Sequence, residues 1–173
     1  METGILNDED KVELLEGYVV EKMPRNPPHD VAIQRLGKRF HRLVPDGWET
    51  RVQSAIRLDD SEPEPDLAVA RGDDHTFATR HPEAADVGMV VEVSDSSLSR
   101  DRLDKARIYS RAGIAVYWIV NLPDQWIEVY SDPTGSGASA TYAQRRDYRP
   151  GDAAPMTLDG VEVGRIAVSE ILG

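Results

Sequence analysis

The sequence predicts an α/β (α+β) fold in which helices flank a mixed β-sheet. Short apolar runs typical of strands alternate with segments whose apolar residues recur at helical spacing. One run, Gly88–Ser94, is apolar almost throughout, as in a strand that is covered on both faces. The order of helix, group of strands, helix and further strands favours a mixed sheet over a doubly wound one. Residues 1–173 contain no repeat and no long linker, so we expect one domain.

Two helices are expected. The first runs from His29 to Val44, where four apolar residues recur at helical spacing, and Asn26–Pro28 before it is expected to be a loop. The second runs from about Arg100 to Ala112 and is closed by Gly113. The apolar residues of the first helix are Ile33, Leu36, Phe40 and Leu43.

The remaining elements are expected to be strands, turns and loops. Leu14–Pro24 indicates the end of a short helix followed by a strand that stops at proline. Residues 71–86 and the Gly/Ser-rich residues 131–140 are expected to be loops, with turns at residues 123–124 and 159–160. Strands are expected at residues 49–58, 66–70, 88–94, 116–121, 126–130, around 142–146 and around 161–168.

Composition favours a soluble, cytoplasmic protein. Hydrophobic residues make up 40% of the chain, and no apolar run approaches the roughly 20 residues that a membrane-spanning helix needs. The acidic start, Met1–Asp10, lacks the pattern of a signal peptide, and the absence of cysteine excludes disulfides and thiolate metal sites. The net charge of −11 is the wrong sign for a protein that coats nucleic acid. Such a chain can still act on DNA if basic residues cluster and metal neutralises some carboxylates.

Glu92 is the residue that the pattern explains least. It lies inside the apolar run Met89–Val93, and an ionised carboxylate in an apolar interior is costly unless it is paired, protonated or bound to a metal. Asp66 places a second acid at the start of another short apolar strand. If the two strands are neighbours, both carboxylates can hold one hard cation such as Mg²⁺ or Mn²⁺. The alternative reading is an edge strand with Glu92 in solvent or paired with an arginine.

Lys105 is the third candidate. Asp101, Lys105 and Tyr109 follow at i, i+4 spacing on one face of the second helix. Lys105 can therefore reach back toward Glu92 and stabilise a pentavalent phosphate or orient the attacking water. The alternative is a surface ion pair between Asp101 and Lys105.

The ordered set of these motifs resembles the Uma-type family, whose bacterial members are described as restriction endonucleases of the PD-(D/E)XK superfamily. The resemblance covers about Leu14–Tyr130 and implies a restriction-endonuclease-like mixed sheet with a metal site at one end. The motifs are Leu14-Leu15-Glu16-Gly17, Met23-Pro24 with His29, Pro65-Asp66, Val91-Glu92-Val93-Ser94, the Asp101/Lys105/Tyr109 spacing, and Gly113 followed by Tyr117-Trp118-Ile119-Val120.

The resemblance also implies roles for individual residues. Asp66 and Glu92 would be the metal-binding acids, with the Val93 carbonyl as a further ligand. The superfamily has a lysine two positions after the second acid, where this chain has Ser94, and the resemblance implies that Lys105 takes that role. Glu16 and His29 match the upstream motif. Glu16 would then be a further acid at the metal. His29 would contact phosphate or water, or else merely start its helix.

The function predicted from these residues is metal-dependent endonucleolytic hydrolysis of nucleic acid, with DNA as the expected substrate. A catalytically inactive nuclease-fold module that binds or regulates is one alternative, and an acid-base hydrolase of carbohydrate or peptide is another. The basic residues expected to grip the nucleic-acid backbone are Arg35, Lys38, Arg39 and Arg42 on the first helix, with Arg100, Arg102 and Arg107 near the site as a second candidate set. The alternative reading of the residues on the first helix is an ordinary solvated helix face. The aromatic residues of the hairpin Val116–Tyr130 suggest a homodimer, with packing in the core of one chain as the alternative.

Overall fold

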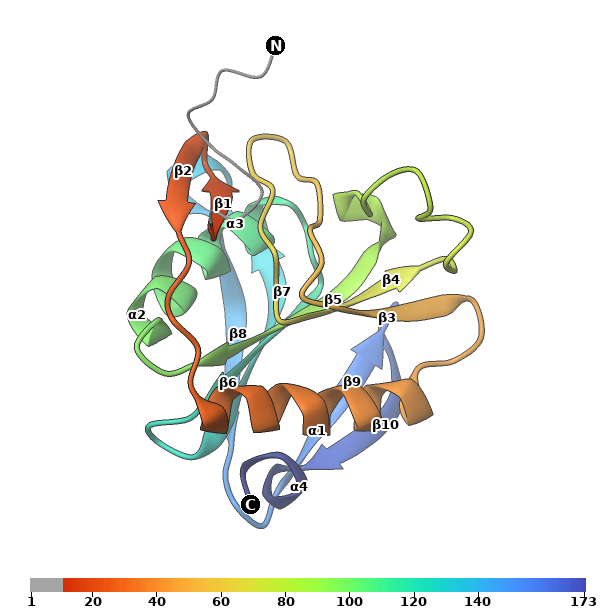
Figure 1. Cartoon of the computed structure of the whole chain (residues 1–173), viewed down its shortest axis with the longest axis vertical. Coiled ribbons are helices and arrows are strands. Elements are labelled where there is room, and N and C mark those ends of the chain that lie inside the picture. The colour runs from red at the N-terminus through yellow and green to blue at the C-terminus, as the bar shows by residue number, and fades with distance from the viewer. Residues whose placement is uncertain (1–10) are drawn as a thin grey trace.

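A computed structural model describes residues 11–173 and is built around a six-stranded sheet in the order β3-β4-β5-β6-β7-β8 (Figure 1). Strands β5 and β6 are parallel, and every other neighbouring pair in this sheet is antiparallel. The predicted mixed sheet is therefore confirmed. Its strands are β3 (Trp48–Val52), β4 (Leu67–Arg71), β5 (Val87–Ser94), β6 (Val116–Asn121), β7 (Trp126–Thr134) and β8 (Thr141–Tyr148).

Two antiparallel hairpins and a set of helices complete the fold. The hairpins are β1 (Val12–Leu15) with β2 (Tyr18–Glu21), and β9 (Ala153–Leu158) with β10 (Val161–Ala167). The helices are α1 (Pro27–Leu43), α2 (Leu98–Arg100), the π-helical turn η2 (Asp101–Lys105), α3 (Ala106–Arg111) and α4 (Val168–Leu172), and 3₁₀ turns lie at η1 (Ala84–Asp86) and η3 (Gly137–Ser139). No helix within residues 11–173 is long and apolar enough to cross a membrane.

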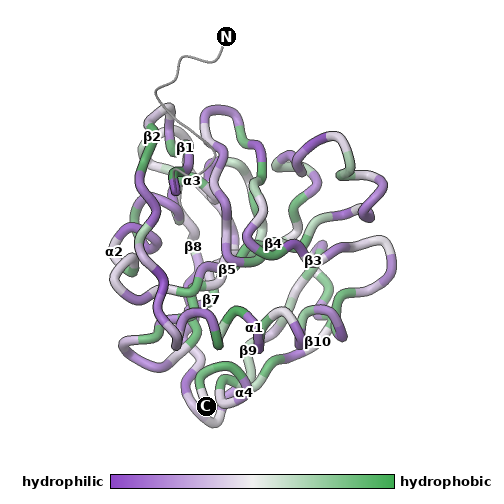
Figure 2. Tube along the Cα trace, viewed as in Figure 1, coloured by the Kyte–Doolittle hydropathy of each residue, from purple (hydrophilic) through white to green (hydrophobic). Residues whose placement is uncertain are grey.

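Each face of the sheet has its own hydrophobic core. Helix α1 and the β9–β10 hairpin cover one face, where Leu36 and Phe40 meet Trp118. The α2–η2–α3 segment covers the other, where Tyr109 packs on Tyr117. Figure 2 shows hydrophobic colour on α4, which lies next to α1 near the C-terminus. Strand β5 is buried along its whole length, as predicted from its apolar run.

Three of the four aromatic residues of the β6–β7 hairpin are buried within the chain, and the fourth, Trp126, is half-buried and donates to Glu128. Tyr117 and Trp118 point to opposite faces and are fully buried, and Tyr130 is 9% exposed beside Tyr117. The unsatisfied aromatic surface that suggested a second copy is therefore not present on these residues. The homodimer itself stays a prediction.

The structure corrects two predicted elements near the start of the described chain. Leu14 lies in strand β1 rather than in a helix end, because Glu16 and Gly17 both have positive φ (50° and 80°) and form the two-residue turn of a hairpin. Helix α1 begins at Pro27 rather than after the proline pair. Asn26 caps it by accepting a hydrogen bond from the His29 amide (3.1 Å), and prolines are tolerated in a first turn.

Several bounds differ elsewhere. Strand β7 extends to Thr134, into the predicted loop, and the predicted strand 49–58 is shorter as β3. Strand β9 and helix α4 were not predicted at all. The prediction made on Met1–Asp10 concerns residues that lie outside the described part of the chain.

Candidate active site

The two predicted acids lie side by side where β4 and β5 meet. In the antiparallel register Leu67 pairs with Val91, which places Asp66 beside Glu92 on the same face of the sheet. Asp66 Oδ2 accepts a hydrogen bond of 2.8 Å from the Val93 amide just beyond that pair. Both carboxylates are nearly buried, with Asp66 8% and Glu92 4% exposed. Pairing of the two strands thus converts acids 26 positions apart in the sequence into one site.

Glu92 uses only one of its carboxylate oxygens within the protein. Oε1 accepts hydrogen bonds from Lys105 Nζ (2.9 Å) and from the Tyr109 hydroxyl (2.7 Å). Oε2 accepts none from residues 11–173, and Glu92 lines a cleft. Burial, against the attraction of Lys105 but together with neighbouring carboxylates, raises the pKa of Glu92 to about 8. The site therefore holds a carboxyl group that would gain from a further positive charge.

Lys105 is held between two acids from different elements. Its ammonium group lies 2.9 Å from Glu92 and 3.3 Å from Glu13 Oε2 in β1, and the side chain is 8% exposed. Glu13 is itself buried, and its Oε2 also accepts a hydrogen bond of 3.3 Å from the Glu64 amide. Burial works to lower the pKa of Lys105, but the surrounding carboxylates outweigh it and the net shift is upward. Lys105 therefore stays an ammonium ion.

The π-helical turn η2 carries Asp101 and Lys105 to this place. Asp101 Oδ2 accepts hydrogen bonds from the hydroxyls of Ser94 (2.6 Å) and Ser97 (2.7 Å). The turn is thereby tied to the end of β5 at Ser94. Isolated π turns inside helices are frequent at functional sites. Burial, partly offset by Lys105, raises the pKa of Asp101.

Asp66 is oriented by donors on its other side. His29 Nε2 lies 3.3 Å from Asp66 Oδ2, and Gln53 Nε2 donates to Oδ1 at 3.4 Å. Burial favours the neutral acid, but His29, the Val93 amide and Lys105 together outweigh burial and lower the pKa of Asp66. Burial likewise tends to lower the pKa of His29, and Asp66 reverses this to a net rise. Arg25 Nη1 donates to Gln53 Oε1 at 2.8 Å, so a chain of contacts runs from Arg25 through Gln53 to Asp66.

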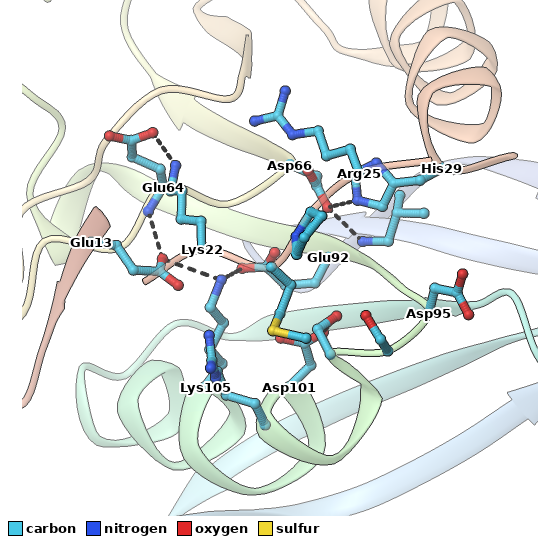
Figure 3. Close-up of a pocket in the computed structure, with 16 residues that line it drawn as sticks. Glu13, Lys22, Arg25, His29, Glu64, Asp66, Glu92, Asp95, Asp101 and Lys105 are labelled. Atoms are coloured by element: carbon cyan, nitrogen blue, oxygen red, sulfur yellow. Dashed lines mark hydrogen bonds and ion pairs between the residues drawn. The ribbon is translucent and has the colours of Figure 1, made fainter. Parts of the chain in front are cut away.

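These side chains line a single cleft between the β1–β2 hairpin, the segment leading into α1 and the α2–η2 segment (Figure 3). Figure 3 shows Glu92 between Lys105 on one side and Asp66 with His29 on the other. The Val93 backbone also lines the cleft. The structure therefore brings together Asp66, Glu92, Val93, Lys105 and His29, five of the residues singled out from the sequence.

Glu16 lies outside this cleft. Its carboxylate pairs with Arg107 (2.7 Å) and Arg111 (2.9 Å) at the turn between β1 and β2, and the Arg107 hydrogen bond, against a small effect of burial, lowers its pKa. The β1 acid in the cleft is Glu13, which sequence reasoning missed. The sequence around it, Val12-Glu13-Leu14-Leu15, shows no polar/apolar alternation. Only the strand geometry of β1 places Glu13 on the same buried face as Leu15.

The basic residues predicted to grip nucleic acid are largely engaged within the chain. Arg35 donates to the Ile171 carbonyl (2.9 Å), Arg39 pairs with Glu170 (3.0 Å), and Arg102 pairs with Glu128. The first two tie α1 to α4 rather than forming a free basic face. Lys38 and Arg42 are exposed on α1, and they do not line the cleft.

The donors in the cleft suit a hard divalent cation. Among residues 11–173 no three His, Asp or Glu side chains are grouped so as to hold a metal ion. Asp66 and Glu92 nonetheless offer two adjacent carboxylates, and Glu92 Oε2 is not committed to a donor of the described chain. Mg²⁺ is usually bound through one or two carboxylates and keeps several waters, so a two-acid site fits this ion. The Val93 carbonyl is a candidate third oxygen.

Comparison with known proteins places the chain in a family. The model of the Uma2 family, described as "Putative restriction endonuclease", matches residues 1–165. The chain belongs to the Uma2 family. The resemblance inferred from its motifs is thus confirmed, and membership of Uma2 indicates a nuclease. No curated protein matches the chain.

A solved structure supports the fold of this Uma2 chain. It is described as "a putative nuclease belonging to DUF820" from Anabaena variabilis ATCC 29413. The two are 13% identical and superpose with a TM-score of 0.66, over 98% of this chain and 93% of that one. At this level of identity the likeness shows a shared fold, and it confirms the predicted nuclease-like mixed sheet flanked by helices.

Proposed function

We propose that the protein is a metal-dependent endonuclease that hydrolyses phosphodiester bonds of nucleic acid, with DNA as the expected substrate. The observation that carries this proposal is the pairing of Asp66 with Glu92 across β4 and β5, with the Lys105 ammonium 2.9 Å from Glu92. Two carboxylates beside a buried ammonium suit a reaction that develops negative charge on phosphate. Family membership in Uma2 supports a nuclease over a carbohydrate- or peptide-cleaving enzyme.

Asp66, Glu92 and the Val93 carbonyl would hold Mg²⁺ or Mn²⁺. When bound, such an ion activates water for attack and neutralises charge on the phosphate oxygens. The protein's own contribution is to fix the two carboxylates. Asp66 is fixed by the Val93 amide and His29, and Glu92 by Lys105 and the Tyr109 hydroxyl.

Lys105 and His29 have the geometry for roles beside the carboxylates. Lys105 is kept charged by Glu92 and Glu13, so it can donate to a phosphate oxygen as negative charge grows there. His29 Nδ1 is buried, makes no hydrogen bond among the described residues and lies 3.7 Å from Asp30 Oδ1, while Nε2 faces Asp66. A water or a phosphate oxygen is a suitable partner for that imidazole once substrate fills the cleft.

The first test is Mg²⁺ and Mn²⁺ binding by calorimetry on the wild type and on Glu92→Gln. We expect binding by the wild type and its loss in the variant, because the amide removes the charge while keeping the shape. Glu16→Gln is the matched control, since Glu16 is an acid outside the cleft, and it should bind metal like the wild type. Asp66→Ala should then abolish Mg²⁺-dependent cleavage of plasmid and oligonucleotide DNA while the protein stays folded. Cleavage that survives in purified Asp66→Ala would end the assignment of this site.

A second candidate is a binding or regulatory module that keeps the nuclease fold without catalysis. It is favoured by Ser94 at the superfamily's lysine position and by Lys105, which already compensates Glu92 in the protein. A well-folded wild type that binds neither Mg²⁺ nor Mn²⁺ would favour this module over the nuclease. Metal binding that depends on Glu92 would favour the nuclease.

A further inference from the structure

The cleft contains more acid than base, which raises the question of what attracts a phosphate into it. Its lining includes six carboxylates against four lysine or arginine side chains. Two of these cations, Lys22 and Lys105, are paired with carboxylates, Lys22 with Glu64 and Lys105 with Glu13 and Glu92. A polyanion entering this cleft therefore needs positive groups that are not already neutralised.

Arg25 and Arg100 are the remaining cations of the cleft. Neither lies within 4 Å of a carboxylate of the described residues. Arg25 donates to the neutral amide oxygen of Gln53 (2.8 Å), and Arg100 donates to the backbone carbonyl of Glu21 (3.0 Å). Both contacts orient a guanidinium without cancelling its charge, so its remaining N–H groups stay available to an anion.

Arg25 is connected to the predicted metal-binding acid Asp66 through Gln53. Its partner Gln53 has positive φ (49°), a conformation that costs energy in a residue other than glycine, and also donates to Asp66 Oδ1. The charge of Arg25 works against the rise in the pKa of His29, whose Nε2 lies 3.3 Å from Asp66, and all three residues line the same cleft (Figure 3). A phosphate bound by Arg25 would therefore lie next to the carboxylate pair. Arg100 reaches the cleft from α2, and its side chain spans to the carbonyl of Glu21 at the end of β2.

We infer that Arg25 and Arg100 form the phosphate grip of the cleft and hold the backbone of the nucleic acid across the site. This inference rests on the proposed function, which names no residue that binds the nucleic-acid backbone, and it supplies two such residues. It replaces the helix α1 stripe predicted from the sequence, where Arg35 and Arg39 are engaged with α4. Guanidinium groups bind phosphate in a bidentate manner, so the grip suits phosphodiester rather than neutral ligands.

The test measures binding of a fluorescently labelled DNA duplex and of a labelled single strand by anisotropy. The full chain is used in EDTA, so that no cleavage occurs, over a range of salt concentrations. Arg25→Gln and Arg100→Gln should each weaken binding by about tenfold or more, because a charged hydrogen bond to phosphate is lost. Each should also make the slope of log K against log salt shallower by about 1. Arg165→Gln is the matched control, an exposed arginine of β10 outside the cleft, and should change neither quantity. Arg42→Gln tests the rival α1 stripe, and we expect it to leave binding unchanged as well.

Three outcomes decide between the claims. If the loss falls on Arg25→Gln and Arg100→Gln and not on Arg42→Gln, the grip is supported. If the wild type binds and, with Mg²⁺, cuts DNA, but the loss falls on Arg42→Gln, the grip is overturned and the nuclease proposal stands. If the wild type neither binds nor cuts nucleic acid, the nuclease proposal fails and the grip fails with it. Should Arg100→Gln melt at a lower temperature, the exposed Arg25 decides alone.

Discussion

Glu92 on β5 and Glu128 on β7 lie on the same face of the sheet with β6 between them, because both pair in register with Ile119 of β6. Both side chains are buried, and both are reached by cations from the π-helical turn η2. Lys105 contacts Glu92, and Arg102 pairs with Glu128. The two regions therefore differ neither in burial nor in the element that covers them. They differ in how many donors each carboxylate receives.

Glu128 is saturated with donors. Arg102 Nε reaches both carboxylate oxygens (3.2 and 3.1 Å), and three further donors come from β6 and from β7 itself. Burial favours the neutral acid, but these hydrogen bonds outweigh it and lower the pKa of Glu128 to about 2. Glu92, by contrast, has two donors on one oxygen and a pKa of about 8. The further donors to Glu128 are the Asn121 amide (2.9 Å), the Trp126 indole (3.1 Å) and the Tyr130 hydroxyl (2.7 Å).

The comparison separates a structural carboxylate from a candidate functional one. A buried acid that has all its hydrogen bonds stabilises the fold and has nothing left to offer a ligand. A buried acid with an uncommitted oxygen, among other acids and beside a cleft, is poised for a cation. Burial of a charged residue in a strand is thus a weak indicator of function until its donors are known.

The largest difference should appear when each acid is removed. We expect Glu128→Ala to lower the free energy of unfolding by about 3–5 kcal/mol, because Arg102 and three further donors lose their partner. Glu92→Gln should cost about 1–2 kcal/mol in metal-free protein, because Glu13 still pairs with Lys105 and the amide still accepts from Tyr109. Urea unfolding at pH 7 measures both. Equal losses would erase the distinction between the two regions.

The pH dependence of stability sharpens the same comparison. The folded pKa of Glu128 is about 2, below its ordinary value of 4.5, so its stabilisation is fully present above pH 4.5. It is lost as the pH falls from there through about 2, and the loss is about 3 kcal/mol. The free energy of unfolding of wild type minus that of Glu128→Gln, measured by urea titration from pH 6 to pH 2.5, should shrink toward low pH. A difference that stays constant over this range would show that Glu128 is not held ionised by its donors.

The sequence predicted the fold best where strands are apolar runs. Strands β4, β5 and β6 lie within a residue of their predicted bounds. Because these strands are buried on both faces, each is a continuous apolar run whose ends are easy to recognise in the sequence. Strand β9 was missed because Pro155 interrupts a short, small-residue segment, and α4 has only five residues, too few to show a helical period. These elements are specified by packing against α1 and β5, which local pattern does not contain.

The site was predicted only in part, because the sequence pattern around a buried acid does not show which distant donors reach it. Val91-Glu92-Val93 and Ile127-Glu128-Val129 are the same pattern, and only the first was singled out. What separates them is the donor set, and Arg102 is 26 residues from Glu128 in the sequence. A local signal did exist, because aromatic residues with polar tips flank Glu128 at positions two before and two after, on the same face of the strand.

The smallest effect concerns which cation holds Glu128. Arg145 Nη2 lies 3.4 Å from Glu128 Oε2, but its side chain is 39% exposed and also pairs with Asp147. We expect Arg145→Ala to cost less than about 1 kcal/mol, as for an ordinary surface ion pair. Arg102→Ala should cost more, because Arg102 makes the bidentate contact and anchors η2, the turn that also carries Lys105. Thermal unfolding of both variants beside Arg165→Ala, which breaks an exposed pair with Glu162, measures the order. If Arg145→Ala cost as much as Arg102→Ala, Glu128 would be held equally from the strand and from the helix. The turn η2 would then no longer link Glu128, whose hydrogen bonds are all made, to Glu92, which keeps one oxygen uncommitted.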